Sequence, residues 1–437
     1  MKTKNPFLLP ALIAGLGLMP AGWASAQTFT TLHSFAPLIP VFTNIDGVFY
    51  TNIDGGVPNG GLILSGNTLY GAANNGGSSG WGTMFAVNTD GSGFTNLHNF
   101  TISSDGGFPN GRLALSGNTL YGTAYEGGSS GLGTVFALNT DGSGFTTLYN
   151  FTGGSSGVNP QAGLVTDLSG NTLYGTAYGG LTTTSDQGTV FKLNTDGTGF
   201  TILHSFTATS GYPPYGNSDG ALPVAGLILS GNTLYGTALR GGSSGVGTVF
   251  ALNADDTGFT NLHSFTAAPC CPYTNSDGAI PAGELILSGN TLYGTAYAGG
   301  SSGKGTVFAV NTDGTGFTTL YDFTGGSDGA NPGAGLLLSG NTLYGTAFNG
   351  SSSGAGTVFS LSFAPQLTIV RSGANVTLTW PTNAPGFDYA GFTLQSTTNL
   401  VSPAVWTTNS PAPVVVNGQF AVTNPISGPQ KFYRLSQ

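Results

Sequence analysis

Charged residues are scarce in this chain of 437 residues, because Asp, Glu, Lys and Arg together make up only 6 % of it. Intrinsic disorder is excluded, since disordered chains are rich in charge and poor in aromatic residues, whereas this chain is 11 % aromatic. Positive charge is the scarcer sign, with nine Lys and Arg against 18 Asp and Glu and a net charge of −9. Binding to nucleic acid needs a basic surface that neutralises phosphates, so nucleic acid is excluded as a partner.

Cysteine is almost absent, and the two cysteines that exist are adjacent, Cys270 and Cys271, between two prolines. Their spacing fits neither a zinc site nor a C-x-x-C redox pair. In an oxidising compartment they can form a vicinal disulfide or pair with another chain, and two free thiols are the remaining alternative. We predict the intramolecular disulfide between Cys270 and Cys271.

Long apolar runs are missing except at the N-terminus, where one extends from Phe7 to Met19. Lys2 and Lys4 precede this run and Ala24-Ser25-Ala26 follows it, which is the pattern of a secretory signal peptide. The run is too short for a membrane anchor, and no later segment is apolar enough to span a bilayer. We therefore predict a signal peptide over residues 1–26 and an exported, soluble protein without a membrane span.

Glycine, by contrast, is abundant, with 74 residues. Long helices are disfavoured because each interior Gly costs about 1 kcal/mol relative to Ala. Collagen is excluded because Gly does not recur at every third position. Most Asp residues directly precede Gly, and Asp-Gly is a turn dipeptide, so most of the negative charge belongs to turns. The composition thus favours a protein rich in β-strands and turns.

Three motifs each recur six times along the chain, with a period of 51 to 61 residues apart from the 65 residues between Phe29 and Phe94. Ser-Gly-Asn-Thr-Leu-Tyr-Gly begins at Ser65, Ser116, Ser169, Ser230, Ser288 and Ser339. Gly-Thr-Val/Met-Phe begins at Gly82, Gly133, Gly188, Gly247, Gly305 and Gly356. Phe-Thr-x-Leu-His/Tyr-x-Phe begins at Phe29, Phe94, Phe145, Phe200, Phe259 and Phe317.

Each repeat contains four strand-like segments, which we name A to D; in the second repeat they are residues 113–116, 119–125, 133–139 and 145–151. Gly117-Asn118 is a two-residue connection typical of a tight hairpin. Segment A is apolar at consecutive positions, which indicates burial on both faces. A four-stranded sheet of this kind needs a neighbour on each side, as a propeller blade does.

The order of the segments favours a closed ring over an open stack. A lone D segment at residues 29–35 precedes the first A, and the last repeat ends after its C segment at Phe363. In a ring the first D can complete the last blade, whereas an open stack gains nothing from this displacement. We predict an all-β fold in which residues 27–363 form a six-bladed β-propeller closed by this N-terminal strand.

At these motifs the chain resembles a known family. The run L-I-L-S-G-N-T-L-Y-G-T-A-x-x-G-G-x-x-G-x-G-T-V-F-A-L-N-T-D-G, which returns six times with small changes, is similar to the Gloeo/Verruco (GloVer) choice-of-anchor tandem repeat of secreted bacterial proteins, over residues 29 to 363. The resemblance implies secreted or surface proteins with varied C-terminal sorting tails, and it implies no established catalytic residues. Unlike anchored members, this sequence has no terminal apolar segment followed by basic residues.

The repeat stops at Pro365, and short strand-like segments separated by Pro, Gly and Asn follow it. Their spacing predicts a small β-sandwich over residues 365–437, with Trp380 and Trp406 as core candidates. This part resembles the fibronectin-III-like tails of exported proteins. Adhesion, a spacer and an export signal all remain open as its role.

Antiparallel connectivity places the B–C and D–A loops at one end of the ring, which we call the long-loop end, and we expect function there. Arg112 and Glu284 begin the A segments of the second and fifth repeats, where the other repeats have Gly, so they should face each other across the channel. The predicted ligand-binding residues at this end are Arg112, Glu284, Glu126, Arg240, Lys304, Trp81, Tyr50, Tyr212, Tyr215 and Tyr273. Phe42 and Phe49 lie in the same loops. General tolerance of charge at exposed loops, and packing of the aromatic rings, are the alternative explanations.

Aromatic rings beside Asp, Asn and Ser suit sugars, which stack their C–H faces and hydrogen-bond through their hydroxyls. The leading hypothesis is a secreted, non-enzymatic binding or surface-interaction protein whose partner is a glycan or another cell-surface component. One alternative is a metal-dependent hydrolase or lyase at the channel mouth, with Asp219, Asp277 and Glu284 as ligands. The other is a structural envelope component.

No catalytic residue, bound metal or cofactor is predicted. The four histidines, His33, His98, His204 and His263, occupy one position of segment D that is Tyr149 and Tyr321 in the other repeats, which indicates packing. The recurring Asn-x-Asp-Gly-x-Gly partly matches a calcium loop, but it lacks the Glu at the twelfth position and is better explained as a turn. The Asp-Gly-x-x-Pro motif between D and A is likewise more typical of a turn cap.

Overall fold

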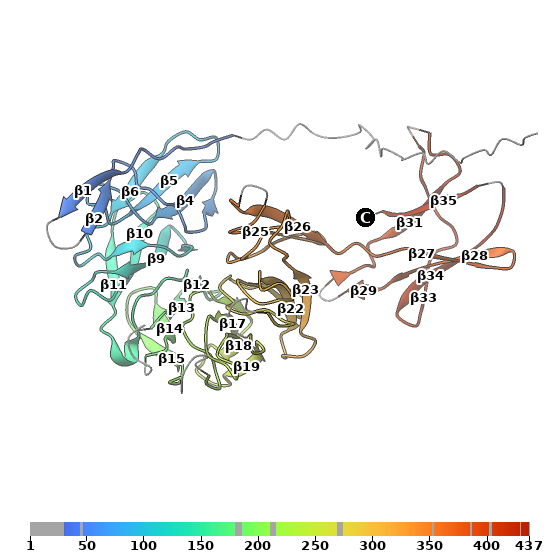
Figure 1. The fold of residues 1–437 in the computed structure, drawn as a ribbon. Coiled ribbons are helices and arrows are strands. Elements are labelled where there is room, and N and C mark those ends of the chain that lie inside the picture. Colours follow the sequence, from blue (N-terminus) through green and yellow to red (C-terminus); the bar gives the residue numbers. More distant parts are fainter. Residues whose placement is uncertain are drawn as a thin grey trace, which may run out of the picture. The chain divides into compact units, whose positions relative to one another are not determined.

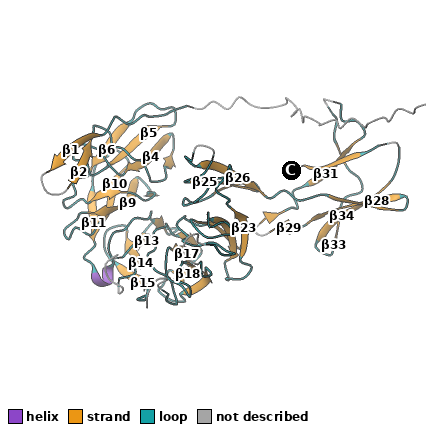
Figure 2. Ribbon diagram, in the orientation of Figure 1, coloured by secondary structure: helices purple, strands orange, loops and turns teal. Residues whose placement is uncertain are grey.

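The computed structural model describes residues 30–43, 47–179, 186–209, 216–268, 274–351, 354–384, 387–401, 404–428 and 430–436. Their regular structure is almost entirely strand, with one three-residue 3₁₀ turn at Gly154–Ser156 (Figure 2). The chain forms two compact units. The repeat unit holds residues 32–366 and 380–390, and the C-terminal unit holds residues 367–379 and 391–437.

Six antiparallel sheets make up most of the repeat unit (Figure 1), and we number them in chain order. Sheet 1 contains β3 (Ile63–Ser65), β4 (Thr68–Ala73), β5 (Thr83–Asn88) and β6 (Thr95–Asn99). Sheet 2 contains β8 (Ala114–Ser116), β9 (Thr119–Glu126), β10 (Thr134–Asn139) and β11 (Thr146–Asn150), with β7 (Gly107–Pro109) also paired to β9. Sheet 3 contains β12 (Val165–Thr166), β13 (Thr172–Ala177), β14 (Thr189–Asn194) and β15 (Thr201–Ser205).

The remaining three sheets repeat this pattern. Sheet 4 contains β16 (Ile228–Ser230), β17 (Thr233–Ala238), β18 (Thr248–Asn253) and β19 (Thr260–Ser264). Sheet 5 contains β20 (Ile286–Ser288), β21 (Thr291–Ala296), β22 (Thr306–Asn311) and β23 (Thr318–Asp322). Sheet 6 contains only β24 (Leu337–Ser339), β25 (Thr342–Ala347) and β26 (Thr357–Ser362). The predicted A-B-C-D order is confirmed in sheets 1 to 5.

The repeated sequence explains how each sheet packs internally. Strand B carries a Gly where strand C places a Phe ring over it; a Cβ added to Gly122 would lie 2.6 Å from Phe136 Cζ. The A–B hairpin turns at Gly117, whose φ of 57° lies in the left-handed region that Gly adopts without strain. Between β10 and β11 the register shifts after Val135, so every C–D pair bends at the same point.

The hydrophobic core consists of interfaces between successive sheets. Between sheets 2 and 3, Tyr121 and Val135 of sheet 2 pack against Leu173 and Phe191 of sheet 3. Phe151, which follows β11, is fully buried in the same cluster, and burying a Phe stabilises the fold by about 2 kcal/mol. Each interior sheet is therefore covered on both faces by its neighbours, as predicted for a blade.

The outer strand carries the histidines, and their side chains pack as predicted. The His98 ring stacks on Phe145 of the next repeat at 3.8 Å, and its Nε2 lies 3.1 Å from Asp105 Oδ2. The same stacking joins His33 to Phe94, Tyr149 to Phe200, His204 to Phe259 and His263 to Phe317. The interpretation of this position as packing is confirmed.

The predicted closing strand is not formed in this structure. Residues 30–38 contain no strand, and the three-stranded sheet 6 ends at β26. Residues 33–36 instead lie on sheet 1, where His33 stacks on Phe94 and the Ala36 N–H donates to the Asp54 carboxylate at 3.0 Å. A strand needs a hydrogen-bonded partner, and this segment has none at its side. The following loop also contains a hairpin that the sequence did not predict, β1 (Ile39–Thr43) with β2 (Gly47–Thr51).

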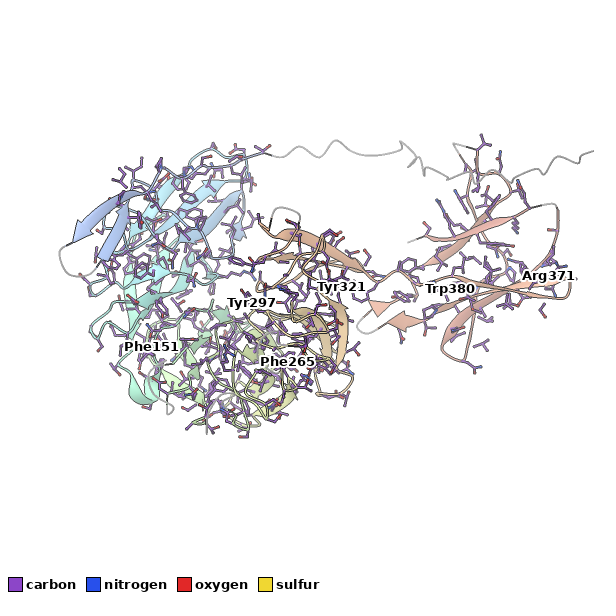
Figure 3. All side chains as sticks on the ribbon, viewed as in Figure 1. Phe151, Phe265, Tyr297, Tyr321, Arg371 and Trp380 are labelled. Carbon is purple, nitrogen blue, oxygen red and sulfur yellow. The ribbon has the colours of Figure 1, made fainter. Side chains whose placement is uncertain are left out.

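The C-terminal unit is built largely from two sheets. One has the order β27 (Thr368–Ser372), β28 (Asn375–Pro381), β34 (Gln419–Pro425) and β33 (Val414–Val416). The other has the order β32 (Thr407–Thr408), β31 (Thr393–Thr397) and β35 (Phe432–Ser436). Residues 380–390, which belong to the repeat unit, contain a short hairpin of β29 (Asn383–Ala384) and β30 (Phe387–Asp388). Trp380, labelled in Figure 3, begins this segment next to the last residue of β28 and is 1 % exposed. In the C-terminal unit, Trp406 is half-buried with the Arg434 guanidinium 4.4 Å above its ring.

Candidate functional site

The starts of the A strands carry only two charged side chains, Arg112 and Glu284. The Arg112 stem lies over Gly61 of sheet 1, and the Glu284 carboxylate lies over Gly226 of sheet 4, because Gly at these neighbouring positions leaves room for each longer side chain. At Gly111 the backbones of successive sheets come so close that an added Cβ would meet the Gly163 nitrogen. The starts of successive A strands are therefore tightly packed, and Arg112 and Glu284 are the charged side chains among them.

Electrostatics show that Arg112 and Glu284 lie within reach of each other. Burial raises the pKa of Glu284, and the positive charge of Arg112 partly offsets this effect. The two residues come from sheets 2 and 5, three sheets apart in the sequence. That they face each other across a channel remains a prediction.

A second group surrounds the ends of strands β9, β13 and β17. Burial raises the pKa of Tyr125, and the neighbouring Glu126 carboxylate adds to the shift, whereas a hydrogen bond with Gln161 opposes it. Burial also raises the pKa of Tyr178, with a contribution from Tyr125 and an opposing one from Arg240. These interactions bring side chains from sheets 2, 3 and 4 together at the long-loop end.

We call these two groups together the mouth cluster: Arg112 with Glu284, and Tyr125 with Glu126, Tyr178 and Arg240. Two guanidinium groups and two carboxylates give it donors and acceptors of both signs, and the two phenols add ring faces with a hydroxyl at their edge. Arg112 is exposed, and the other five members are half-buried. The arrangement can therefore hold a polar ligand through hydrogen bonds and ring contacts.

Three of the predicted ligand-binding residues, Trp81, Lys304 and Tyr50, have other surroundings. Trp81 packs edge-on against Phe108 with ring centroids 5.1 Å apart, within the interface of sheets 1 and 2. The Lys304 stem lies along Gly325, in the D–A loop that follows sheet 5. Tyr50 is in β2 and is 42 % exposed. For Trp81 the packing explanation fits the geometry.

The other predicted residues lie outside the described part of the chain: Tyr212, Tyr215, Tyr273, Cys270 and Cys271, together with the signal peptide over residues 1–26. The side chains of Phe42 and Phe49 are also not described. The ligand-binding and disulfide assignments at these positions remain predictions.

The aspartates proposed as metal ligands are engaged in the outer turns. Asp219 Oδ2 lies 2.9 Å from His204 Nε2 and accepts the Thr207 N–H at 3.0 Å, while Oδ1 accepts the Thr207 hydroxyl. Asp277 makes the same contacts with His263 and Thr266. Both therefore act as turn caps. Within the described ranges no group of three or more His, Cys, Asp or Glu side chains is placed to hold a metal ion.

Sequence reasoning missed Tyr125, Tyr178 and Gln161. A signal for the tyrosines was present, because the residue directly after strand B varies while the motif before it is nearly invariant. That residue is Asn74, Tyr125, Tyr178, Leu239, Tyr297 and Phe348 in the six repeats. Gln161 carried no comparable signal, since only the fold shows that it reaches Tyr125.

Comparison with solved structures gives distant similarity. A nidogen–laminin complex matches with a TM-score of 0.39 and 18 % identity, covering 63 % of this chain and 84 % of that chain. A proposed 6-phosphogluconolactonase from Bacteroides uniformis matches with a TM-score of 0.42 and 18 % identity, covering 81 % of this chain and 94 % of that chain. Similarity at this level carries no argument about function.

No curated protein matches the chain. Among the described residues, no helix has the length and apolar character needed to cross a membrane. The model of the Gloeobacter/Verrucomicrobia repeat matches residues 24–218 and 271–385, which is more than half of the chain. The resemblance seen in the repeated motifs is thereby confirmed, and the chain belongs to the Gloeobacter/Verrucomicrobia repeat family.

Proposed function

We propose that this protein is a secreted, non-enzymatic binding protein that holds a glycan at the mouth cluster. The observation that carries the proposal is that two electrostatically linked groups, Arg112 with Glu284 and Tyr125 with Tyr178 and Arg240, are drawn from four different sheets at the long-loop end of the repeat unit. Charge is rare in this chain, so two guanidinium groups and a partly buried carboxylate at the same end cannot be attributed to a generally charged surface.

The chemistry of the cluster suits a hydroxyl-rich ligand. Sugars present alternating hydroxyls and C–H faces, and phenol rings contact the C–H faces while guanidinium and carboxylate groups bond the hydroxyls. The partly buried Glu284 strengthens such hydrogen bonds, because the low local dielectric weakens competition from water. A wholly apolar ligand would leave these polar groups without partners.

The scaffold of this proposal is a six-bladed β-propeller made of sheets 1 to 6, followed by a fibronectin-III-like sandwich made of the two sheets of the C-terminal unit. Support comes from six similar sheets in chain order and from sheets of four and three strands in the C-terminal unit. Secretion rests on the signal-peptide pattern of residues 1–26.

Binding to a glycan array, followed by calorimetry with the strongest glycan, tests the function. The variants are Arg112→Ala and Tyr178→Ala, and the control is Tyr321→Ala, on the outer strand β23 with 38 % exposure. We expect each mouth variant to bind at least about 10-fold more weakly, and the control to bind as the wild type does. Absence of glycan binding by the wild type, or unchanged binding by both mouth variants, contradicts the proposal and favours a structural envelope role.

A further inference from the structure

In each of sheets 1 to 5, the same contact between a Gly and a Pro joins the sheet to the next one. Strand C begins with a Gly whose added Cβ would meet a Pro of the following repeat, and the Pro lies in the D–A loop. The pairs are Gly82 with Pro109, Gly133 with Pro160, Gly188 with Pro223, Gly247 with Pro281 and Gly305 with Pro332. Just before each Pro, a residue donates its N–H to the preceding sheet, as Phe108 does to the Trp81 carbonyl at 2.8 Å.

In the described part of the chain, sheet 6 has the equivalent cavity without the Pro. The cavity of about 680 Å³ lies against Thr346, Phe348, Gly356, Thr357 and Val358, and the three atoms nearest to a Cβ added at Gly356 belong to Ala347 and Phe348, with no Pro among them. In sheet 5 the equivalent space is filled by sheet 6: Pro332 contacts Gly305, and Thr295 Oγ1 donates to the Ala334 carbonyl at 2.9 Å. Thr295 is 1 % exposed, whereas its equivalent Thr346 is exposed.

Sheet 1 has the corresponding Pro, but no preceding sheet in the chain order receives it. Val57 and Pro58 precede strand β3 in the position of Ile280 and Pro281, and both are exposed. The six residues at the Val57 position all have positive φ, between 55° and 61°: Val57, Phe108, Asn159, Leu222, Ile280 and Asn331. A β-branched residue rarely adopts this backbone, and in the other five the N–H is bonded to the previous sheet. Among the described residues the Val57 N–H has no acceptor. Val57 thus has the backbone conformation that, in the other repeats, accompanies a hydrogen bond to the preceding sheet.

The faces of the two end sheets are also complementary. On sheet 6, Val358 is 83 % exposed and Tyr344 is 42 % exposed, whereas Val307 and Tyr293, their equivalents on sheet 5, are fully buried. On sheet 1, Leu62 is 48 % exposed, while its five equivalents, Leu113, Leu164, Leu227, Leu285 and Leu336, are at most 7 % exposed. Each end sheet thus exposes residues whose equivalents in the other sheets are buried by a neighbouring sheet.

We propose that sheet 6 docks on sheet 1 of the same chain: Val57 and Pro58 enter the cavity against Gly356, and residues 33–34 pair with β26. By the register of the other sheets, Ser34 lies opposite Thr357 and His33 opposite Val358, as Ser264 and His263 lie opposite Thr248 and Val249. His33 already stacks on Phe94 as the other D strands do on the next repeat, so this segment needs only β26 at its side.

The curvature of the sheets favours the same chain over a second copy. Successive A strands lie against one another at their starts, since a Cβ added to Gly111 would meet the Gly163 nitrogen and one added to Gly335 would lie 3.2 Å from the Glu284 carbonyl oxygen. The row of sheets is therefore drawn together along its A strands and curves around a centre on that side, where the Arg112 charge of sheet 2 also acts on Glu284 of sheet 5. Sheets 6 and 1 are then neighbours around that centre. The local concentration of one end about the other, joined through the five existing interfaces, exceeds that of a second molecule in dilute solution.

A cysteine pair tests this docking in the full chain. The variant combines Ser34→Cys and Thr357→Cys with Cys270→Ser and Cys271→Ser. The control carries Thr248→Cys and Ser264→Cys in the same background, because these residues are paired across β18 and β19 at the same repeat position. After mild oxidation at low protein concentration, peptide mapping by mass spectrometry reports which cysteines are linked. We expect both variants to form the disulfide within monomers.

Two outcomes overturn the proposal. One is a disulfide-linked dimer or ladder, which assigns the cavity to a second copy. The other is the absence of the Ser34–Thr357 link while the control pair is oxidised. A second measurement is thermal unfolding of Val358→Asp against Val415→Asp, the latter on exposed strand β33. Docking buries Val358, so its variant should lower Tm by about 5 °C or more, and equal, small shifts for both variants contradict the docking.

Discussion

At the scale of single residues, the D–A turns show how a carboxylate becomes structural. Asp219 is 5 % exposed, and burial by itself opposes its ionisation. Hydrogen bonds from His204 and from the hydroxyl and N–H of Thr207 outweigh burial and lower the pKa of Asp219. Repeat 5 has the same hydrogen bond with another side chain, since the Tyr321 hydroxyl donates to Asp328 at 3.2 Å.

Asp219→Asn should lower the free energy of unfolding at pH 7 by about 1 to 3 kcal/mol, because it weakens hydrogen bonds to a buried charged group. The folded pKa lies below the unfolded one, so ionisation stabilises the fold above the unfolded pKa, and this contribution is lost as pH falls through the folded pKa. The difference between the variant and the wild type should therefore shrink in strong acid. Urea unfolding at pH 7 and at lower pH measures it.

The matched control for this prediction is His204→Tyr. Tyr149 and Tyr321 already occupy the equivalent position, and each stacks or hydrogen-bonds as the histidines do. The control should change stability by less than about 1 kcal/mol. A larger loss for His204→Tyr than for Asp219→Asn would show that the imidazole itself, and not the capped carboxylate, stabilises the turn.

At the scale of the element, the packing of each sheet depends on a Gly in strand B. A Cβ added to Gly294 would lie 2.5 Å from Phe308 Cζ and 2.8 Å from Leu285 Cδ2, and the Phe308 ring is fully buried. Neither neighbour has room to move in a close-packed core. The repeated Tyr-Gly is thus a packing requirement, and the repeat keeps it for that reason.

Gly294→Ala should lower the free energy of unfolding by about 1 to 3 kcal/mol, since overpacking forces the neighbouring side chains from their preferred positions. Gly391→Ala is the control, because nothing lies within 4 Å of a Cβ added there and its φ is not positive. Thermal unfolding followed by circular dichroism compares the two variants. Equal stability of Gly294→Ala and the wild type would show that the B–C packing is looser than the structure has it.

At the scale of the whole molecule, apolar interfaces and turn hydrogen bonds dominate, and charge contributes little. In the parts of the chain that the structure describes, the close ion pairs are the four between His33, His98, His204 or His263 and an Asp. Burial lowers the pKa of His98, which further limits its charge near neutral pH. Salt should therefore have little to screen.

The melting temperature at pH 7.5 should change by less than about 3 °C between about 0.05 M and 0.5 M NaCl. Differential scanning calorimetry in the two buffers measures the change. A fall of 10 °C or so on adding salt would mean that charge pairs outside those described hold the molecule together.

The repeated sequence by itself determined the strands, their order and the packing of the outer position, because each repeat contains its own hairpin turns, its Gly under a Phe, and a His or Tyr that stacks on the next Phe. The local pattern did not predict correctly whether the closing strand forms. Residues 30–36 match the other D segments, but a strand forms only where the edge of a partner strand lies beside it.

Only the tertiary structure decided which loop residues meet. Sequence spacing placed Arg112 and Glu284 on opposite A strands, but Tyr125, Tyr178 and Arg240 approach one another because three sheets converge, and Trp81 turns to Phe108 instead. Backbone pattern is a local property set by turns and alternation. Convergence of side chains depends on the angle between successive sheets, and that angle is set by how their buried faces pack.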